Sequence, residues 1–391
     1  MIGNSQAAGR HSYAYVDLDA IRHNVREIRG QLQQKTHLAA VVKADAYGHG
    51  SIPVARAAIE AGADMLAVAM ADEAVPLRNA GLDGPILVIG PSNSEQLALG
   101  VTHGLDLCVA DVESLLTMEE IAAQTDRIAR MHLKIDTGMG RIGVRPGAEL
   151  NELLAQARQC RHVDVAGLFT HFARADEYDD SAPTLTQFRR FREAVDAVAG
   201  NGYDPILHVS NSAATQNIPE LDLDMVRFGI SLYGYPAGQG KAVRELHLKR
   251  AMRVEAEVSV VRDVRAGSPI GYGGTFVASR TSRIATVQIG YGDGYSRQMS
   301  NRGSMIVQRG TDAYLAPVVG RVCMDMTMID VTDCPDGRSG ERVVVMGASG
   351  NTCWDAADIA RECNTIPYEV LCGFTQRLPR VYCGTESRDD R

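Results

Sequence analysis

Residues 38–50 read LAAVVKADAYGHG, and this stretch decides both the fold and the first candidate for chemistry. Five apolar residues, Leu38 to Val42, run directly into Lys43, and a helical pattern follows from Ser51. An apolar run of this length, bounded by turn residues, is typical of a strand buried on both faces. We expect Lys43 where this strand leaves the core, because partial desolvation lowers the pKa of a lysine and makes its amine a nucleophile. The alternative is a lysine that extends from the strand end into water.

The same alternation of apolar run and helical pattern repeats through the first part of the chain. Strands that alternate with helices predict βαβ units and a parallel sheet. Eight such runs predict an α/β fold with an N-terminal (β/α)8 TIM-like barrel. An open doubly wound sheet is the alternative, but no G-x-G-x-x-G follows the first strand, which counts against a dinucleotide-binding version. The strand-like runs are Leu38–Ala44, Asp64–Ala69, Pro85–Gly90, Leu105–Ala110, Met131–Asp136, Val163–His171, Ile206–Ser212 and Met225–Gly234.

The pattern changes after about residue 250, where apolar and polar residues alternate singly. Val254, Ala256 and Val258 alternate with charged neighbours, which is typical of a half-exposed antiparallel strand. Further strand-like runs follow between glycine-rich turns. The sequence therefore predicts a barrel domain over residues 12–245 and a mainly antiparallel β domain over residues 246–391, with the boundary inside 238–250.

Composition excludes several classes of function. The net charge of −8 argues against nucleic acid or an anionic membrane as the main partner. No apolar run approaches the length of a membrane span, and the first residues carry no secretory signal, so we expect a cytoplasmic protein. The eight cysteines form no C-x-x-C pair, so no metal site is expected.

Polar residues follow the strands on one side of the predicted barrel. In this fold the active site lies at the carboxyl ends of the strands, so these residues are expected to converge. They are Lys43 after strand one, Lys134, Asp136 and Arg141 at strand five, Thr170 and His171 at strand six, Asn211 and Ser212 at strand seven, and Arg227, Gly229 and Ile230 at strand eight.

The ends of strands seven and eight are the usual phosphate site of such a barrel. Ser212 offers a hydroxyl, and the amides near Gly229 and Ile230 can point at an anion. The alternative is that Asn211 and Ser212 only cap a helix. A reactive lysine beside a phosphate site is the requirement for pyridoxal phosphate. Arg227 is then the candidate partner of the pyridine nitrogen, which an arginine would leave unprotonated.

Nine ordered motifs resemble those of the alanine racemases, from about Tyr15 to Arg380. They are VVKADAYGHG, LKIDTGMGRIGV, THFA, VSNSAA, VRFGISLYG, IGYGGTF, IGYGDGY, VGRVCMDM and TIPYEVLC. The resemblance implies a pyridoxal-phosphate enzyme that interconverts L- and D-alanine and supplies D-alanine for peptidoglycan. It also implies a homodimer in which each active site takes residues from both subunits.

The resemblance assigns the two catalytic groups. Lys43 resembles the lysine that binds the cofactor and acts as the base for the D-enantiomer. Tyr272, in IGYGGTF, resembles the base on the opposite face, which the partner subunit supplies. Two groups are needed because a proton leaves one face of a planar carbanion and returns to the other. His171 and Arg227 resemble the residues linked to that tyrosine by hydrogen bonds.

The remaining assignments rest on the same resemblance. Arg141 matches the residue that contacts the cofactor and the substrate carboxylate, and Lys134 matches a position that is often carbamylated; the alternative for Lys134 is a pair with Asp136. Met324 and Cys323, again from the other subunit, resemble the pocket for the substrate carboxylate, and Tyr291 resembles a residue at the entrance, with Asp325 and Arg297 in matching positions. The phosphate ligands by resemblance are Tyr47, Ser212, Gly229, Ile230 and Tyr368.

Asp45 departs from the family motif, which often has asparagine there. A carboxylate two residues from Lys43 would raise the pKa of the lysine if it faced inward, and we expect little effect because it need not face that way.

Three other functions stay open. A barrel decarboxylase of the same cofactor class would use a carboxylate at the pyridine nitrogen and a catalytic cysteine, for which Cys323 is the candidate. A cofactor carrier would need neither the β domain nor Tyr272. A broad-specificity racemase would need a wider pocket than Met324 and Tyr368 suggest.

Overall fold

The computed structural model describes residues 11–177, 179–238, 242–334 and 338–384. It divides into two compact units. We call Ala20–Ala46 with Ser51–Lys249 the barrel unit, and Met1–Asp19, Tyr47–Gly50 and Arg250–Arg391 the β unit.

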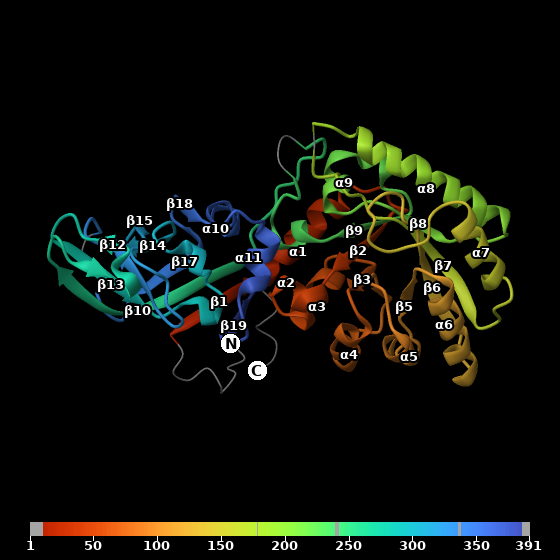
Figure 1. Cartoon of the computed structure of the whole chain (residues 1–391), viewed down its shortest axis with the longest axis horizontal. Helices are drawn as coiled ribbons and strands as arrows, with labels where there is room; N and C mark the ends of the chain where they lie inside the picture. The colour runs from red at the N-terminus through yellow and green to blue at the C-terminus, as the bar shows by residue number, and fades with distance from the viewer. Residues whose placement is uncertain (1–10, 178, 239–241, 335–337, 385–391) are drawn as a thin grey trace. The chain divides into compact units, whose positions relative to one another are not determined.

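The barrel unit contains an eight-stranded parallel sheet with helices outside it (Figure 1), which confirms the predicted α/β barrel. The spatial order is β8-β7-β6-β5-β4-β3-β2-β9, so neighbours in the sequence are neighbours in the sheet. The strands are β2 His37–Val41, β3 Met65–Val68, β4 Ile86–Val88, β5 Asp106–Val109, β6 Ala129–Lys134, β7 Val163–Phe169, β8 Ile206–His208 and β9 Met225–Phe228. The helices are α1 Leu18–Arg29, α3 Ser51–Glu60, α4 Ala71–Asn79, α5 Ser94–Thr102, α6 Val112–Gln124, α7 Ala148–Ala157, α8 Ala182–Gly200 and α9 Ser212–Asn217.

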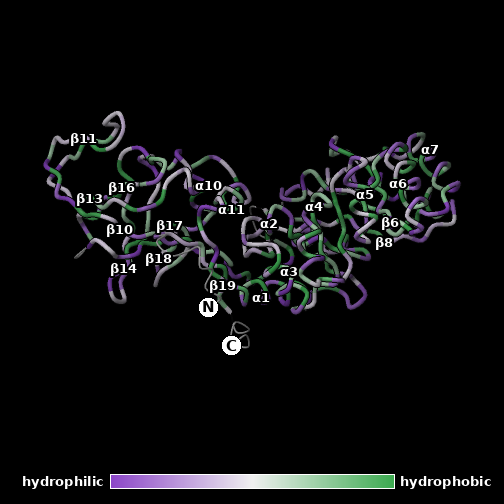
Figure 2. Tube along the Cα trace, turned by 90° about the horizontal axis from the view of Figure 1, so that it is seen from below, coloured by the Kyte–Doolittle hydropathy of each residue, from purple (hydrophilic) through white to green (hydrophobic). Residues whose placement is uncertain are grey.

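The barrel closes between β8 and β9. Asn211 and Arg227 form an isolated parallel bridge there, and the amide of Asp224 donates to the carbonyl of Leu207 at 3.1 Å. Every residue of β3, β4, β5 and β9 is buried. These strands are mainly apolar because both faces are covered, and Figure 2 shows hydrophobic stretches of chain, coloured green, in the barrel unit.

Local sequence explains where the elements begin and end. Asn93 and Asp111 cap α5 and α6, because their side chains accept the amides of Gln96 and Ser114. Helix α1 begins at Leu18, and Asp19 lies in its first turn. The barrel strands also end earlier than predicted, so that Lys43 lies beyond β2.

The β unit contains a nine-stranded sheet, which confirms the expected antiparallel character. Strand β10 (Met252–Val264) pairs antiparallel with β1 (Ser12–Asp17), β13 (Ser282–Val287) and β17 (Arg342–Ser349). The other elements include β14 Ser304–Arg309, β15 Asp312–Pro317, β16 Thr327–Asp330, β18 Thr352–Trp354, α10 Ala356–Cys363, α11 Pro367–Gly373 and β19 Arg380–Cys383. Strand β1 thus belongs to this sheet, whereas the expected range 12–245 assigned it to the barrel domain. The expected boundary within 238–250 includes 239–241, which lie outside the described residues.

Candidate active site

The carboxyl ends of the barrel strands carry the predicted site residues of the barrel unit. Lys43 follows β2, Arg141 lies in the loop after β6, and His171 follows β7. Burial lowers the pKa of His171, and the positive charges of Arg227, Lys134, Arg141 and Lys43 lower it further, so these side chains lie near it. The structure therefore brings these predicted residues together at one end of the barrel.

The turn that begins at Lys43 is left-handed. Residues 44–47 all have φ between 51° and 54°, and they form the short segment labelled α2 (Lys43–Tyr47). A left-handed helical conformation costs a non-glycine residue about 1–2 kcal/mol. A strained backbone of this kind persists only where the surroundings over-determine it, and it is frequent at functional sites.

Two carboxylates hold this turn from outside. Glu73 at the start of α4 accepts the amide of Ala44 at 2.8 Å with one oxygen and the amide of Ala69 at 2.7 Å with the other. Asp45 accepts the amide of Ser51 at 2.7 Å, so its carboxylate is directed at the start of α3. The residue that departs from the family motif therefore anchors the turn.

Arg227 in β9 is buried, and its two terminal nitrogens are held by the protein. Nη1 donates to Nδ1 and to the carbonyl of His208, at 2.9 and 3.0 Å. Nη2 donates to the carbonyls of Thr170 and Val209, at 2.8 and 3.1 Å. Among the contacts of the described residues, none engages the Nε–H, so this donor is available to a ligand. Burial lowers the pKa of Arg227 to about 10, which still leaves the guanidinium charged at neutral pH.

His171 is partly buried beside Arg227 and is neutral. Its Nδ1 lies 3.5 Å from Nη2 of Arg227, and its Nε2 lies 3.5 Å from the side-chain amide of Asn211. Burial, and after it the charge of Arg227, lowers the pKa of His171 well below the usual value of a histidine.

Lys134 is a buried amine without a hydrogen-bond partner. Its side chain is 3% exposed, and within the described residues no acceptor lies within reach of Nζ, which instead sits 4.8 Å from the centre of the Phe169 ring. Burial and the charge of Arg227 lower the pKa of Lys134 to about 7. The alternative pair with Asp136 is wrong, because that carboxylate accepts backbone amides of residues 138–140, at 2.9 to 3.1 Å.

The predicted phosphate residues lie where β8 and β9 end. The hydroxyl of Ser212 accepts the amide of Gly229 at 2.7 Å, and both Ser212 and Ile230 are buried. Asn211 caps α9 by accepting the amide of Ala214 at 3.0 Å, and this cap is compatible with a second role at the cofactor site. Ile230 begins the turn η2 (Ile230–Tyr233), and in the described structure no side chain caps its amides.

Tyr47 and Tyr368 lie together in the β unit. Their ring centroids are 5.9 Å apart at an angle of 47°, and Tyr47 is buried. Burial, with Tyr368 and Cys372, raises the pKa of Tyr47, so its phenol keeps the proton and remains a hydrogen-bond donor. These two predicted phosphate ligands are thus neighbours, although 321 residues separate them in the sequence.

Three other predicted residues of the β unit are exposed. Tyr272, in the turn η3 (Tyr272–Gly274), is 70% exposed, Met324 is 51% exposed and Tyr291 is 42% exposed. The carbonyls of Cys323 and Met324 accept the amides of Tyr291 and Gly292 at 3.0 and 2.9 Å, which brings three predicted residues together.

Two further predicted residues lie in the same unit. Asp325 binds Arg377 at 2.7 Å, and Arg297 begins the turn η5 (Arg297–Met299).

Sequence reasoning missed several polar residues inside the barrel. Asp106, His132 and His208 are buried within strands that otherwise read as apolar, and Glu73 lies in a helix. The sequence does contain a signal for Asp106, His132 and His208. A polar residue within an apolar strand that is buried on both faces needs a polar partner, so each of these residues predicts a buried hydrogen bond.

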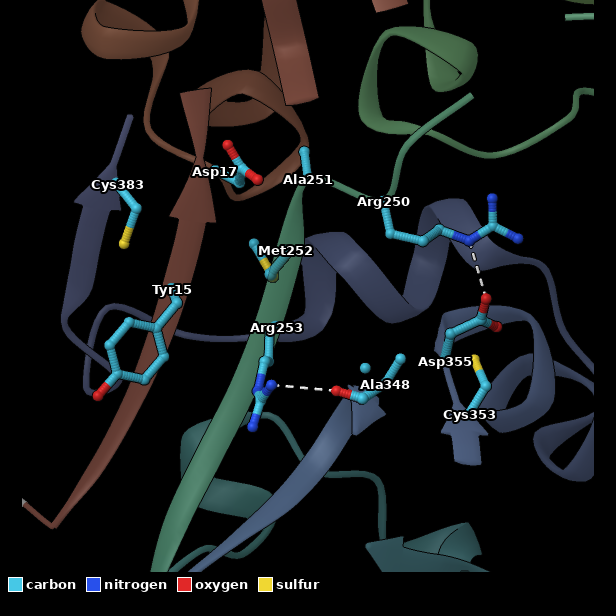
Figure 3. A pocket seen from close by; sticks show the side chains of 11 residues that line it. Tyr15, Asp17, Arg250, Ala251, Met252, Arg253, Ala348, Cys353, Asp355 and Cys383 are labelled. Atoms are coloured by element: carbon cyan, nitrogen blue, oxygen red, sulfur yellow. Dashed lines mark hydrogen bonds and ion pairs between the residues drawn. The ribbon is translucent and has the colours of Figure 1, made fainter. Parts of the chain in front are cut away.

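A pocket of about 320 Å³ lies in the β unit and is separate from the predicted residues. Arg250 binds Asp355 at 2.8 Å at one side of it, and Arg253 donates to the carbonyl of Ala348 at 3.0 Å (Figure 3). Its lining consists of Tyr15, Asp17, Arg250, Ala251, Met252, Arg253, Gly347, Ala348, Cys353, Asp355 and Cys383. In the ranges that the structure covers, we find no helix long and apolar enough to cross a membrane and no cluster of metal-binding side chains.

Comparisons with known proteins agree over nearly the whole chain. Residues 16–237 match the family model of the alanine racemase N-terminal domain, and residues 251–382 match that of the C-terminal domain. Alanine racemase 1 of Oceanobacillus iheyensis is 42% identical over 376 residues, which cover 95% of this chain and 98% of the relative. The alanine racemase of Halothermothrix orenii is 42% identical over 374 residues, 95% of this chain and 97% of the relative.

Solved structures give the same result. Alanine racemase from Streptomyces coelicolor A3(2) superposes with a TM-score of 0.91 at 33% identity and covers 97% of this chain and 100% of that one. A structure from Bartonella henselae, described as alanine racemase with covalently bound pyridoxal phosphate, has a TM-score of 0.82 at 26% identity. The match covers 95% of this chain and 99% of that one.

Proposed function

The chain belongs to the alanine racemase family and interconverts L-alanine and D-alanine, and from this premise we propose that Lys43 and Tyr272 are the two groups that move the proton. The D-alanine formed supplies peptidoglycan synthesis in this proposal. The observation that carries the assignment is Arg227, with its terminal nitrogens held by the protein and its Nε–H left for a ligand.

The residues at the barrel end fit pyridoxal phosphate. The free Nε–H of buried Arg227 suits the ring nitrogen, and the hydroxyl of Ser212 with the amide of Ile230 suits the phosphate. The family resemblance would assign the phenols of Tyr47 and Tyr368, whose rings lie 5.9 Å apart, as further ligands of the phosphate. Lys43 would attach the cofactor covalently. Pyridoxal phosphate, when bound, withdraws electrons from the α-carbon of an amino acid and so acidifies its proton.

Arg227 favours racemisation over other reactions of this cofactor class. Its pKa of about 10 keeps the proton on the guanidinium, so it would donate a hydrogen bond to the ring nitrogen of the cofactor without protonating it. The cofactor would then withdraw electrons weakly, which would favour return of the proton to the α-carbon. His171, held neutral by burial and the nearby charges, adds no positive charge to this environment.

Two groups on opposite faces are required for the change of configuration. The amine of Lys43 takes or returns the proton on one face, and the phenol of Tyr272 does so on the other. Tyr272 would come from a second copy of the chain. Its exposure of 70%, with Tyr291 and Met324 exposed on the same unit, supports a role at an interface between copies.

The substrate carboxylate would meet Arg141 and the backbone at Met324. Arg141 lies in the loop that Asp136 organises through three backbone amides. Lys134 would support Arg141 once its neutral amine has reacted with carbon dioxide, because the product is an anion that can pair with a guanidinium.

A complementation experiment tests the shared site. Lys43→Ala and Tyr272→Phe are each expected to abolish racemisation in a homodimer. When the two variants are co-expressed, half of the dimers are hybrids, and each hybrid holds one site with both native groups. Activity should therefore return to about a quarter of the wild-type value. Racemase activity is measured by chiral analysis of alanine, and the same analysis with serine and lysine reports the substrate range.

The matched control is a pair of variants from the same unit. Lys43→Ala co-expressed with Arg227→Ala leaves every site with one defect, so no activity should return. If Lys43→Ala with Tyr272→Phe also stays inactive while hybrid dimers form, Tyr272 is not a partner-supplied base.

The decarboxylase alternative is less well supported. It needs a carboxylate at the ring nitrogen, where this chain has Arg227, and a reactive cysteine. Burial raises the pKa of Cys323, so its sulfur is a protonated thiol. Release of carbon dioxide from ornithine or diaminopimelate by the purified protein would favour that alternative.

A further inference from the structure

A row of hydrogen bonds crosses the inside of the barrel from Asp106 to Arg227. Oδ2 of Asp106 lies 3.2 Å from Nε2 of His132, and Nδ1 of His132 lies 2.9 Å from Nε2 of His208. Nδ1 of His208 lies 2.9 Å from Nη1 of Arg227. The four residues come from β5, β6, β8 and β9, and none of them is more than 4% exposed. We call this row the Asp106–Arg227 relay.

The chemistry of its two ends fixes every proton in the relay. Arg227 can only donate, so Nδ1 of His208 accepts and its Nε2 carries the hydrogen. That hydrogen is donated to Nδ1 of His132, whose Nε2–H then faces Asp106, an acceptor when ionised. Burial lowers the pKa of His208 well below its usual value. Burial raises the pKa of Asp106, but hydrogen bonds from His132 and Arg130 outweigh that and leave it below the usual value, so the carboxylate is ionised.

Neighbouring residues pack tightly against the two histidine rings of the relay. A Cβ at position 167 would lie 2.2 Å from Nδ1 of His132, so β7 has glycine there. The Phe169 ring stacks on His208 with centroids 4.8 Å apart and planes at 4°. Nε of Arg130 donates to Asp106 at 2.9 Å. Each member of the relay is therefore held in one orientation.

We propose that Asp106 is a positioning residue for Arg227, acting through His132 and His208 from the amino-terminal end of β5. In this arrangement the carboxylate fixes His132, His132 fixes His208, and His208 orients the guanidinium so that its Nε–H faces the ligand. The role toward the cofactor rests on the proposed function. The proton order of the relay can be measured without any cofactor.

The first measurement is histidine tautomer assignment by ¹⁵N–¹H correlation spectra of the cofactor-free protein at neutral pH. His132 and His208 should both be neutral with the hydrogen on Nε2. A hydrogen on Nδ1 of either ring, or a doubly protonated ring, would overturn the relay whether or not the protein binds a cofactor.

The second measurement compares Asp106→Ala with Asp106→Asn. The alanine variant removes the acceptor of His132, and we expect the ring resonances of both histidines to move, the visible absorption of the bound cofactor to shift, and kcat to fall about tenfold while KM for alanine changes little. The asparagine variant keeps an acceptor oxygen and should stay near the wild type. The matched control is Asp164→Ala, since Asp164 lies 3.6 Å from Arg130 but outside the relay.

The outcomes separate the two proposals. If Asp106→Ala matches Asp164→Ala in the His208 resonances, the cofactor absorption and kcat, Asp106 does not position Arg227. Equal losses in both Asp106 variants would also contradict the role in orientation. If the wild-type protein binds no pyridoxal phosphate, the proposed cofactor site is refuted. The histidine tautomers of the cofactor-free protein would still test the relay.

Discussion

Lys134 should carry carbon dioxide, and its environment predicts how readily the reaction occurs. Only the neutral amine adds to carbon dioxide, forming an N–C bond and releasing a proton. At pH 7.5 an amine with a pKa of about 7 is about three-quarters neutral, whereas an ordinary lysine with a pKa of 10.5 is about one part in a thousand neutral. The reactive form of Lys134 is therefore about 750-fold more abundant than that of an exposed lysine.

The assay is ¹³C NMR of the protein equilibrated with ¹³C-labelled bicarbonate. The wild type should show one carbamate resonance that Lys134→Gln lacks and that Lys35→Gln, a change at an exposed lysine, retains. Removal of carbon dioxide should lower racemase activity, and its return should restore it. A wild-type spectrum without a carbamate resonance specific to Lys134 would refute the reasoning.

The same pKa predicts the effect of pH on stability in buffer free of carbon dioxide. The folded pKa of Lys134 lies below the unfolded value, so the unfolded chain binds more protons between about pH 7 and 10.5, and stability rises with pH across that window. At pH 7 and below, charging the buried amine costs about 5 kcal/mol, at 1.36 kcal/mol for each pKa unit. Lys134→Met should therefore be most stabilising below pH 7, and its advantage should shrink toward pH 10.5 in denaturant titrations. An advantage that does not vary with pH would contradict the lowered pKa.

Three further predictions follow from single side chains. Tyr272→Phe should exchange the α-proton of only one enantiomer with deuterium in heavy water; exchange of both enantiomers at the wild-type rate would exclude the phenol as a base. Ser212→Ala should weaken binding of pyridoxal phosphate about tenfold through the loss of a hydrogen bond to a charged group, as measured by spectrophotometric titration, and unchanged affinity would remove this hydroxyl from the phosphate site. Gly167→Ala should destabilise the fold by about 1–3 kcal/mol because the new methyl group overlaps His132, whereas Gly200→Ala, with nothing within 4 Å, should be neutral or stabilising in thermal denaturation; equal effects would contradict the close contact.

The sequence predicted the barrel because its signal is local and repeated. Each apolar run predicted a strand buried on both faces, and each helical pattern predicted the helix that connects two parallel strands. The eight strands could therefore be counted in order. The site followed from the same logic. Parallel strands present all their carboxyl ends at one face, which is why Lys43, His171 and Arg227 could be expected to converge.

The sequence was least informative where the chain departs from its local preference. Nothing in KADAYG predicts four consecutive left-handed residues, because Ala and Tyr disfavour that conformation, and contacts with Glu73 and Ser51, which lie outside the segment, help to hold it. The place of β1 was missed for a related reason, since strand pairing depends on partners more than 200 residues away.

The sequence by itself determined the order of the strands, the class of each domain and the residue types at the mouth of the barrel. Only the tertiary structure decided which proton each of those residues holds. The lowered pKa of the Lys134 amine, the orientation of the Arg227 guanidinium and the relay from Asp106 all depend on burial and on hydrogen-bond partners from separate strands. Desolvation and hydrogen bonding depend on all the groups that lie near a residue in space. Because those groups come from distant parts of the chain, no local sequence pattern predicts them.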